Sequence, residues 1–169
     1  TGLPIATYFS LSKILWFLRN VDEVNKAKLD NDLCFGTIDS WLLYKLTGNH
    51  VTDVTNASRT LLMDLDTLNW MENVINRLDI PLVSLPSIKP SMFNYGTNEE
   101  ILKNVPITAV LGDQQASLFG HNCISSGDVK NTYGTGCFAL TNTGSEIVHS
   151  KNGLLSTVAY QKDGDKPQY

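Results

Sequence analysis

Two short stretches of the sequence combine residue types that could do chemistry. In the first, an apolar run over residues 107–111 ends at Gly112 and is followed at once by Asp113, Gln114 and Gln115. A carboxylate can accept a hydrogen bond from an alcohol or take its proton as a general base, and an amide can both donate and accept. Asp113 and Gln114 are therefore able to hold a hydroxyl compound.

The second stretch is a glycine-rich turn, Gly134-Thr135-Gly136, between strand-like runs over residues 127–133 and 137–143. Such a turn lets backbone N–H groups, and here one hydroxyl, approach phosphate oxygens. Phosphoryl transfer depends mainly on positioning and charge neutralisation, so a base and a phosphate turn can lie on opposite walls of one cleft. Taken alone, each stretch is more often an ordinary turn with a structural role.

The elements around these stretches predict a mixed α/β chain. A strand that ends at Asp113 and leads into a short helix places the acid where open α/β sheets bind ligands. The apolar spacing predicts a helix that begins at Ser10, with Ser10 as its N-cap, and another that begins after Thr37 and ends at Gly48. Tyr8 precedes the first helix, where it can point into a cleft or pack on the first turn.

The remaining segments are predicted from shorter patterns. We expect helices over residues 22–29 and from residue 66 or 67 to 78, and strands over 33–35, 61–65 and 154–160. The polar segment 50–60 is expected to form a hydrogen-bonded loop. In that loop Arg59 could meet a phosphate, but pairing with Asp53 or with a backbone carbonyl is the preferred interpretation.

Composition narrows the possible partners. The 169 residues carry a net charge of −4, with 13 Lys and Arg against 17 Asp and Glu, and no block of like charge, which argues against nucleic acid and anionic membranes. No apolar run approaches the roughly 18 residues of a membrane span. The three cysteines are widely spaced, fit neither a disulfide framework nor a zinc site, and indicate a reducing, cytoplasmic compartment.

The pattern changes near residues 121–127, from mixed α/β to short strands joined by glycine turns. This change predicts a domain boundary, with residues 1–122 in one domain and 123–169 in the next. Because the chain starts at Thr1 and opens like the middle of a domain, we expect an internal fragment of a longer protein.

Six stretches, spread over nearly the whole chain, resemble the glycerol kinases, which belong to the FGGY carbohydrate kinase family. They are Tyr8-Phe9-Ser10, Phe35-Gly36-Thr37-Ile38-Asp39-Ser40-Trp41-Leu42, Thr52-Asp53-Val54-Thr55-Asn56-Ala57-Ser58-Arg59-Thr60, Gly112-Asp113-Gln114-Gln115-Ala116, Asn131-Thr132-Tyr133-Gly134-Thr135-Gly136-Cys137-Phe138 and Lys151-Asn152-Gly153-Leu154-Leu155. The resemblance implies a ribonuclease H-like (actin/hexokinase-like ATPase) α/β fold with two domains around an ATP cleft. Residues 1–122 would belong to the glycerol side and 123–169 to the nucleotide side.

The resemblance also implies a role for each matched residue. Asp113 would be the base that activates the terminal hydroxyl of glycerol, with Gln114 and Tyr8 hydrogen-bonded to the glycerol hydroxyls. Phe138 would pack on the carbon backbone of glycerol. Thr135, with Gly134 and Gly136, would meet the nucleotide phosphates.

The implied reaction is ATP-dependent phosphorylation of glycerol to sn-glycerol 3-phosphate in glycerol catabolism. Within the family, the two glutamines after the acid favour glycerol, because xylulose-type kinases resemble Gly-Asp-Asn-Ala there. The ligands of Mg²⁺ and the adenine pocket are expected outside this chain, and the resemblance implies a homo-oligomer, a dimer or a tetramer. Two alternatives remain: a kinase for another polyol or ketose, and a non-catalytic ligand-binding module. Residues 1–169 alone are expected to be inactive.

One departure concerns regulation. Bacterial relatives have a Gly- and Arg-containing loop before the strand that leads to the acid, and this loop is linked to inhibition by fructose 1,6-bisphosphate. Here residues 98–104 contain Glu99, Glu100 and a single cation, Lys103, which make a poor anion site. We therefore do not expect that regulation in this protein.

Overall fold

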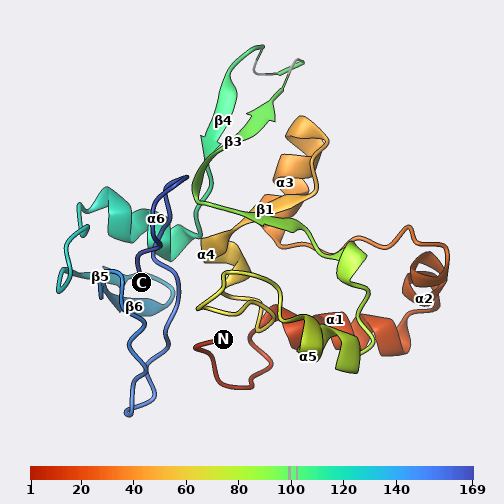
Figure 1. Ribbon diagram of the computed structural model, residues 1–169, viewed down its shortest axis with the longest axis horizontal. Coiled ribbons are helices and arrows are strands. Elements are labelled where there is room, and N and C mark those ends of the chain that lie inside the picture. The colour runs from red at the N-terminus through yellow and green to blue at the C-terminus, as the bar shows by residue number, and fades with distance from the viewer. Residues whose placement is uncertain (99, 102) are drawn as a thin grey trace.

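The computed structural model describes residues 1–98, 100–101 and 103–169, and Figure 1 shows their arrangement. The helices are α1 (Ser10–Asn20), α2 (Asp22–Leu29), α3 (Ile38–Thr47), α4 (Val54–Ala57), α5 (Glu72–Arg77) and α6 (Asp113–Gly120), with a 3-10 helix η1 (Leu82–Ser84). The strands are β1 (Val51–Asp53), β2 (Ser87–Lys89), β3 (Met92–Thr97), β4 (Pro106–Ala109), β5 (Val129–Tyr133) and β6 (Cys137–Thr141). The prediction for residues 98–104 lies in part outside the described residues, at positions 99 and 102.

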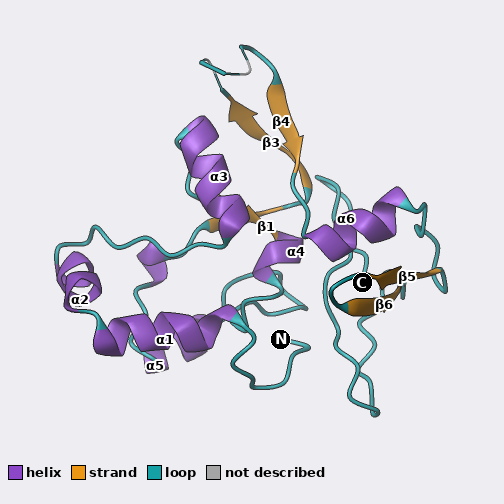
Figure 2. Cartoon of the chain, turned by 180° about the vertical axis from the view of Figure 1, so that it is seen from behind, coloured by secondary structure: helices purple, strands orange, loops and turns teal. Residues whose placement is uncertain are grey.

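The described strands form three two-stranded sheets. β1 and β2 are parallel, whereas β3–β4 and β5–β6 are antiparallel pairs. The β3–β4 hairpin projects from the rest of the molecule in both views of the chain (Figures 1 and 2). β4, the strand before Asp113, is therefore seen here in an antiparallel hairpin, and it ends at Ala109 rather than at residue 111 as predicted.

Helix α1 starts at Ser10 as predicted, but its N-cap is Phe9 and not Ser10. Its buried residue Ile14 packs with Leu62, Ile75 and Leu85 in one hydrophobic core. The apolar repeat of the helix therefore has the structural role expected for it, and it holds the segment that carries Tyr8 against the residues after α4.

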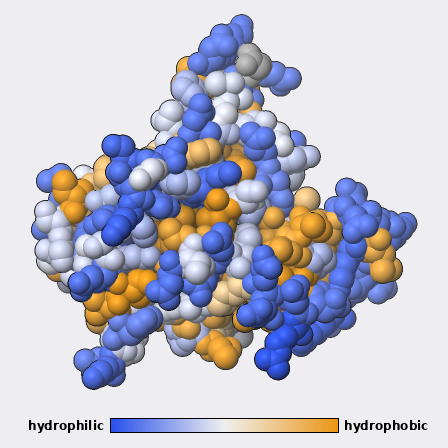
Figure 3. Space-filling model, viewed as in Figure 1, coloured by the Kyte–Doolittle hydropathy of each residue, from blue (hydrophilic) through white to orange (hydrophobic). Residues whose placement is uncertain are grey.

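Helix α3 also matches its prediction, and Gly48 ends it with a φ of 75°, in the left-handed region that favours glycine. Its apolar side chains Ile38, Trp41 and Leu42 nevertheless remain exposed. Figure 3 shows that apolar patches reach the surface between polar regions on the face viewed there. Ile38 and Leu42 line a cleft, so part of the apolar side of this helix serves as a wall and not as core.

Two further cores connect segments that are distant in the sequence. Val54 and Ala57 of α4 pack with Val158 and Tyr169 near the carboxyl end. Leu118 of α6 packs with Cys123 and Ala159 in the other core, against which Leu140 of β6 also packs. Helix α6 is thus held by both the C-terminal segment and the β5–β6 hairpin, which lie beside it in Figure 1.

Several predictions from short patterns were wrong. Residues 33–35, 61–65 and 154–160 form no strand; Met63–Trp70 and Tyr160–Gln168 are isolated bridges. The helix predicted from residue 66 or 67 to 78 is α5, and it begins only at Glu72. The Asp64 carboxylate accepts hydrogen bonds from the N–H groups of residues 66 and 67, at 2.8 and 2.9 Å, and fixes a turn there. The segment 50–60, expected as a loop, contains β1 and α4.

Candidate active site

One open cleft of about 1270 Å³ collects the residues predicted to bind a hydroxyl compound. Tyr8, Asp113, Gln114 and Phe138 all line it. They come from the segment before α1, from the start of α6 and from β6. Residues spread over positions 8 to 138 therefore line the same cleft.

Asp113 is the first residue of α6 and is exposed to the cleft. Its Oδ1 accepts a hydrogen bond of 2.8 Å from the backbone N–H of Gln114. The helix dipole favours a carboxylate in the first turn, so the position stabilises a charged acceptor.

A buried chain of hydrogen bonds holds the turn that carries Asp113. The Gly112 N–H donates to the Thr55 hydroxyl at 2.8 Å, and that hydroxyl lies 2.8 Å from Oδ2 of Asp53. Asp53 is 0% exposed and also accepts from the N–H groups of Thr55 and Asn56, at 3.0 Å each. Burial raises the pKa of the Asp53 carboxyl, and the two backbone hydrogen bonds oppose that rise.

The two glutamines after the acid have different surroundings. Gln115 is 4% exposed, and its Nε2 lies 3.5 Å from the Thr157 hydroxyl, which in turn is 2.7 Å from the Ser58 hydroxyl. A Cβ at position 112 would lie 2.7 Å from Oε1 of Gln115, so a larger residue there would force the Gln115 side chain to move. The Gln115 side chain is therefore buried beneath the turn. The less buried Gln114 instead faces the cleft and contacts a lysine.

That lysine, Lys130, was not found from the sequence. It lies on β5, is 5% exposed, and its Nζ donates to Oε1 of Gln114 at 2.5 Å and to the Thr132 hydroxyl at 2.6 Å. Lysine in a strand is usually solvated, so its residue type carried no signal. The strand alternation places Lys130 and Thr132 on one face, and this was the available clue.

Phe138 lies opposite Thr132 in the β5–β6 register and is 41% exposed. Its ring lies beside Gly136: a Cβ on Gly136 would lie 2.7 Å from Cε2 of Phe138. The turn residues Gly134, Thr135 and Gly136 are exposed, and the Gly134 N–H donates to the Gly136 carbonyl at 3.1 Å. They do not line the cleft themselves but directly precede residues that do.

Tyr8 is 70% exposed and meets the ring of Phe9 edge-on at 5.3 Å. Arg59 lines the same cleft, and its guanidinium lies 5.3 Å from the centre of the Phe9 ring. Burial lowers the pKa of Arg59, and the nearby Tyr8 opposes this. Of the two pairings expected for Arg59, with Asp53 or with a backbone carbonyl, the one with Asp53 was wrong: within the described chain, Asp53 bonds to Thr55, Asn56 and Ser91.

The sequence is similar to a known protein family over most of its length. The model of the FGGY family of carbohydrate kinases, N-terminal domain, matches residues 1–120. The chain belongs to the FGGY carbohydrate kinases. The predicted family and its actin/hexokinase-like fold are confirmed.

Relatives of this FGGY chain include the glycerol kinase of Renibacterium salmoninarum, 52% identical over 99% of this chain, and that of Beutenbergia cavernae, 54% identical over 99%. The crystal structure of Plasmodium falciparum glycerol kinase with ADP superposes on the whole chain with a TM-score of 0.94 and 43% identity. The chain spans about a third of each of these proteins: 34% of the two bacterial enzymes and 35% of the Plasmodium chain.

A more distant FGGY structure, gluconate kinase from Lactobacillus acidophilus, has a TM-score of 0.77 at 24% identity over 99% of this chain and 34% of its own. At that identity the likeness shows the fold alone. The fold therefore does not distinguish among the substrates of the family. Substrate preference depends on the residues that line the cleft.

Neither a metal site nor a membrane-spanning helix is found in the described part of this FGGY chain. Its His, Cys, Asp and Glu side chains form no group of three that could hold a metal ion. None of the described helices is long and apolar enough to cross a bilayer.

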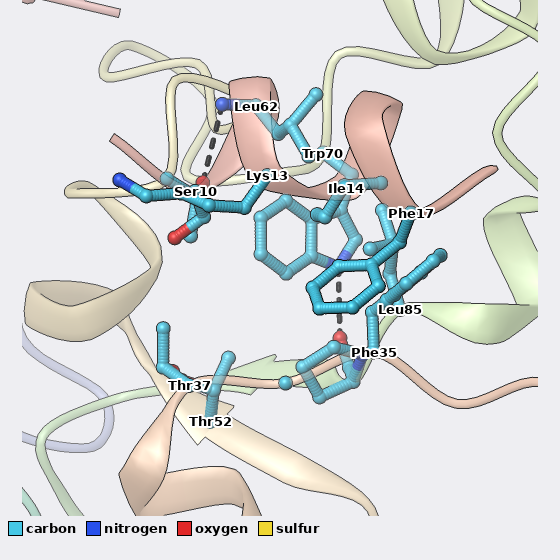
Figure 4. A pocket seen from close by; sticks show the side chains of 13 residues that line it. Ser10, Lys13, Ile14, Phe17, Phe35, Thr37, Thr52, Leu62, Trp70 and Leu85 are labelled. Atoms are coloured by element: carbon cyan, nitrogen blue, oxygen red, sulfur yellow. Dashed lines mark hydrogen bonds between the residues drawn. The ribbon is translucent and has the colours of Figure 1, made fainter. Parts of the chain in front are cut away.

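A second cavity, of about 200 Å³, lies beside α1 and is shown in Figure 4. Ile14 and Phe17 of α1, Phe35 and Trp70 are among the side chains around it, and the Trp70 Nε1–H donates to the Pro86 carbonyl at 2.7 Å. None of the predicted site residues lines this cavity. The apolar walls belong mostly to the core around α1.

Proposed function

We propose that the protein containing this chain is an ATP-dependent glycerol kinase that forms sn-glycerol 3-phosphate. The observation that carries the proposal is the convergence of Tyr8, Asp113, Gln114 and Phe138 on one cleft. The similarity to glycerol kinases at about 50% identity supports it, because it extends over the whole of this chain.

In the proposed reaction Asp113 is the general base. Its exposed carboxylate accepts the proton of the terminal glycerol hydroxyl while that oxygen attacks the γ-phosphorus of ATP, and the bond from phosphorus to the leaving ADP oxygen breaks. Gln114 and Tyr8 hydrogen-bond to the glycerol hydroxyls, and the Phe138 ring packs on the carbon chain. These contacts restrict glycerol to one orientation, which lowers the entropy cost of the transition state.

The glycine turn is proposed to meet the nucleotide. Thr135, between Gly134 and Gly136, lies next to the cleft-lining residues Cys137 and Phe138, so a phosphate at the turn would lie close to bound glycerol. We place a domain boundary between residues 122 and 123, with the glycerol side before it and the nucleotide side after it. The end of the family match at residue 120 supports this placement.

Mg²⁺ accompanies ATP in this proposal, held by ligands other than the described residues. We further propose that the protein is cytoplasmic and forms a homo-oligomer, a dimer or a tetramer. The three cysteines, Cys34, Cys123 and Cys137, are unpaired, in keeping with a reducing compartment.

The test is a coupled ADP-release assay of the full-length protein with glycerol, dihydroxyacetone, xylulose and gluconate as acceptors. We expect the highest kcat/KM with glycerol, by at least about tenfold, because each good polar contact to the substrate contributes about that factor. Xylulose or gluconate as the preferred acceptor would assign a different substrate to the same fold. Absence of turnover with all four would leave a non-catalytic module as the conclusion.

A further inference from the structure

We propose that Lys130 is a positioning residue that fixes the Gln114 side chain as a hydrogen-bond donor toward the substrate. The inference rests on the proposed function and extends it to a residue that no sequence pattern singled out. It concerns how the cleft recognises a polyol, namely which polar groups of the cleft accept hydrogen bonds and which donate them.

The first observation is the burial of the Lys130 ammonium without a counter-charge. Within the described chain the ion pair found is Lys28–Asp79, and Lys130 is not part of it. Its Nζ instead donates to two neutral oxygens, Oε1 of Gln114 and Oγ1 of Thr132. A buried charge is costly unless its hydrogen bonds are made, so these two contacts are strongly constrained.

The second observation is the direction of the contact with Gln114. An ammonium group has three donors and no acceptor, so the atom of Gln114 that faces it must be the carbonyl oxygen. The two ends of a glutamine amide are otherwise hard to distinguish, and here the chemistry of Lys130 decides between them. The NH₂ group is therefore the end left for the cleft that Gln114 lines.

The consequence is a complementary pair of neighbouring groups. The charged Asp113 carboxylate can only accept, and Gln114 held in this way presents N–H donors beside it. A polyol fits both at once: one hydroxyl gives its hydrogen to Asp113, and the oxygen of a second hydroxyl accepts from Gln114. Polarisation of the amide by the buried ammonium strengthens the donor further.

The position of Lys130 also matters. It lies on β5 opposite Leu140, two residues before Thr132, which pairs with Phe138. Lys130 and Phe138 are thus on the same face of the β5–β6 hairpin. One hairpin face therefore supplies the proposed apolar contact to glycerol and also orients the glutamine on α6. Across the proposed domain boundary, this contact would link the nucleotide side to the glycerol side.

A double-mutant cycle in the full-length protein tests the inference. Lys130→Met, which keeps the length but removes the donor, should raise KM and the calorimetric Kd for glycerol by about 10-fold or more, with kcat changed far less. Gln114→Ala should raise both constants at least as much. If Lys130 acts through Gln114, the double variant should match Gln114→Ala alone, because the second substitution has no amide left to release.

Lys28→Met is the matched control, since it removes a lysine from the exposed ion pair with Asp79, and it should leave KM unchanged. Should Lys130→Met not fold, Lys130→Gln takes its place, because its amide keeps a neutral donor near Gln114 and its effect should again vanish in the Gln114→Ala background. Additive effects, or an unchanged KM in Lys130→Met, would overturn the role of Lys130 while wild-type turnover upholds the kinase proposal. Wild type that fails to phosphorylate glycerol would overturn the proposed function itself.

Discussion

The two turns that flank the cleft are built in opposite ways. The Gly112–Asp113 turn is held by a hydrogen bond from Gly112 to Thr55, which are 57 residues apart in the sequence, and Thr55 in turn donates to the fully buried Asp53. The turn over residues 134–136 is exposed, and the contacts found for it are the hydrogen bond from Gly134 to Gly136 within the turn and the Phe138 ring of β6. One turn is fixed by the core of the molecule, the other by its own hairpin.

This difference matches the tasks proposed for the two turns. A general base must be held within reach of one proton, and a buried network of satisfied hydrogen bonds gives that precision. A turn that meets a phosphate needs close backbone approach and room for the ligand, which an exposed glycine turn offers. A substitution that disrupts the first turn should therefore lower the stability of the whole fold, whereas a substitution in the second turn should change only the local structure.

The largest effect is expected for Asp113→Asn. The amide keeps the size of the side chain but cannot take a proton, so kcat should fall by about 10²–10⁴-fold while glycerol binding changes little. Steady-state kinetics and calorimetry on the full-length protein measure the two quantities separately. Near-normal turnover would remove Asp113 as the base and end the contrast between the two turns.

Next comes Thr55→Val, which tests the support of the first turn. Valine has the shape of threonine but leaves the Gly112 N–H and the Asp53 carboxylate each without one partner. The free energy of unfolding should fall by about 1–3 kcal/mol, measured by urea denaturation. Thr55→Ser keeps the hydroxyl and is the control, which should lose clearly less. Equal losses would mean that packing, and not the hydrogen bonds, holds this turn.

Phe138→Ala tests the apolar wall supplied by the hairpin. Loss of the ring should weaken glycerol binding by about 1–3 kcal/mol, because the proposed contact with the carbon chain is lost. Phe138→Leu, which retains an apolar side chain, should lose less. Unchanged calorimetric affinity in the alanine variant would place Phe138 outside the glycerol site.

The smallest effect should separate the two glycines of the exposed turn. Alanine at 136 would place its Cβ 2.7 Å from Cε2 of Phe138 and force the ring to turn, whereas alanine at 134 would meet only a backbone oxygen at 3.7 Å. We expect Gly136→Ala to weaken glycerol binding by about 0.5–1.5 kcal/mol, the cost of an off-rotamer side chain, and Gly134→Ala to leave it nearly unchanged. The reverse order would show that Gly136 does not act through Phe138.

Local patterns predicted the elements with strong signals. Helices α1, α2 and α3 appeared where apolar spacing or terminal residues indicated them, and the β5–β6 hairpin formed around its glycine turn. The short strand predictions failed because a few apolar residues in extended conformation look the same whether or not a partner strand lies beside them. Residues 154–160 are an example: they pack on α4 and α6 without forming a strand.

The sequence by itself determined the family, the candidate base Asp113 and the glycine turn, because these depend on residue types in fixed local order. Only the tertiary structure decided that Tyr8, Gln114 and Phe138 share one cleft with that base. It also showed that Asp53 and Thr55 support the turn before α6 and that Lys130 is a buried cation. The local sequence does not indicate these roles, because hydrogen bonds across the fold join residues that are distant in the sequence. The acid at 113 was visible from its neighbours, and what holds and surrounds it was not.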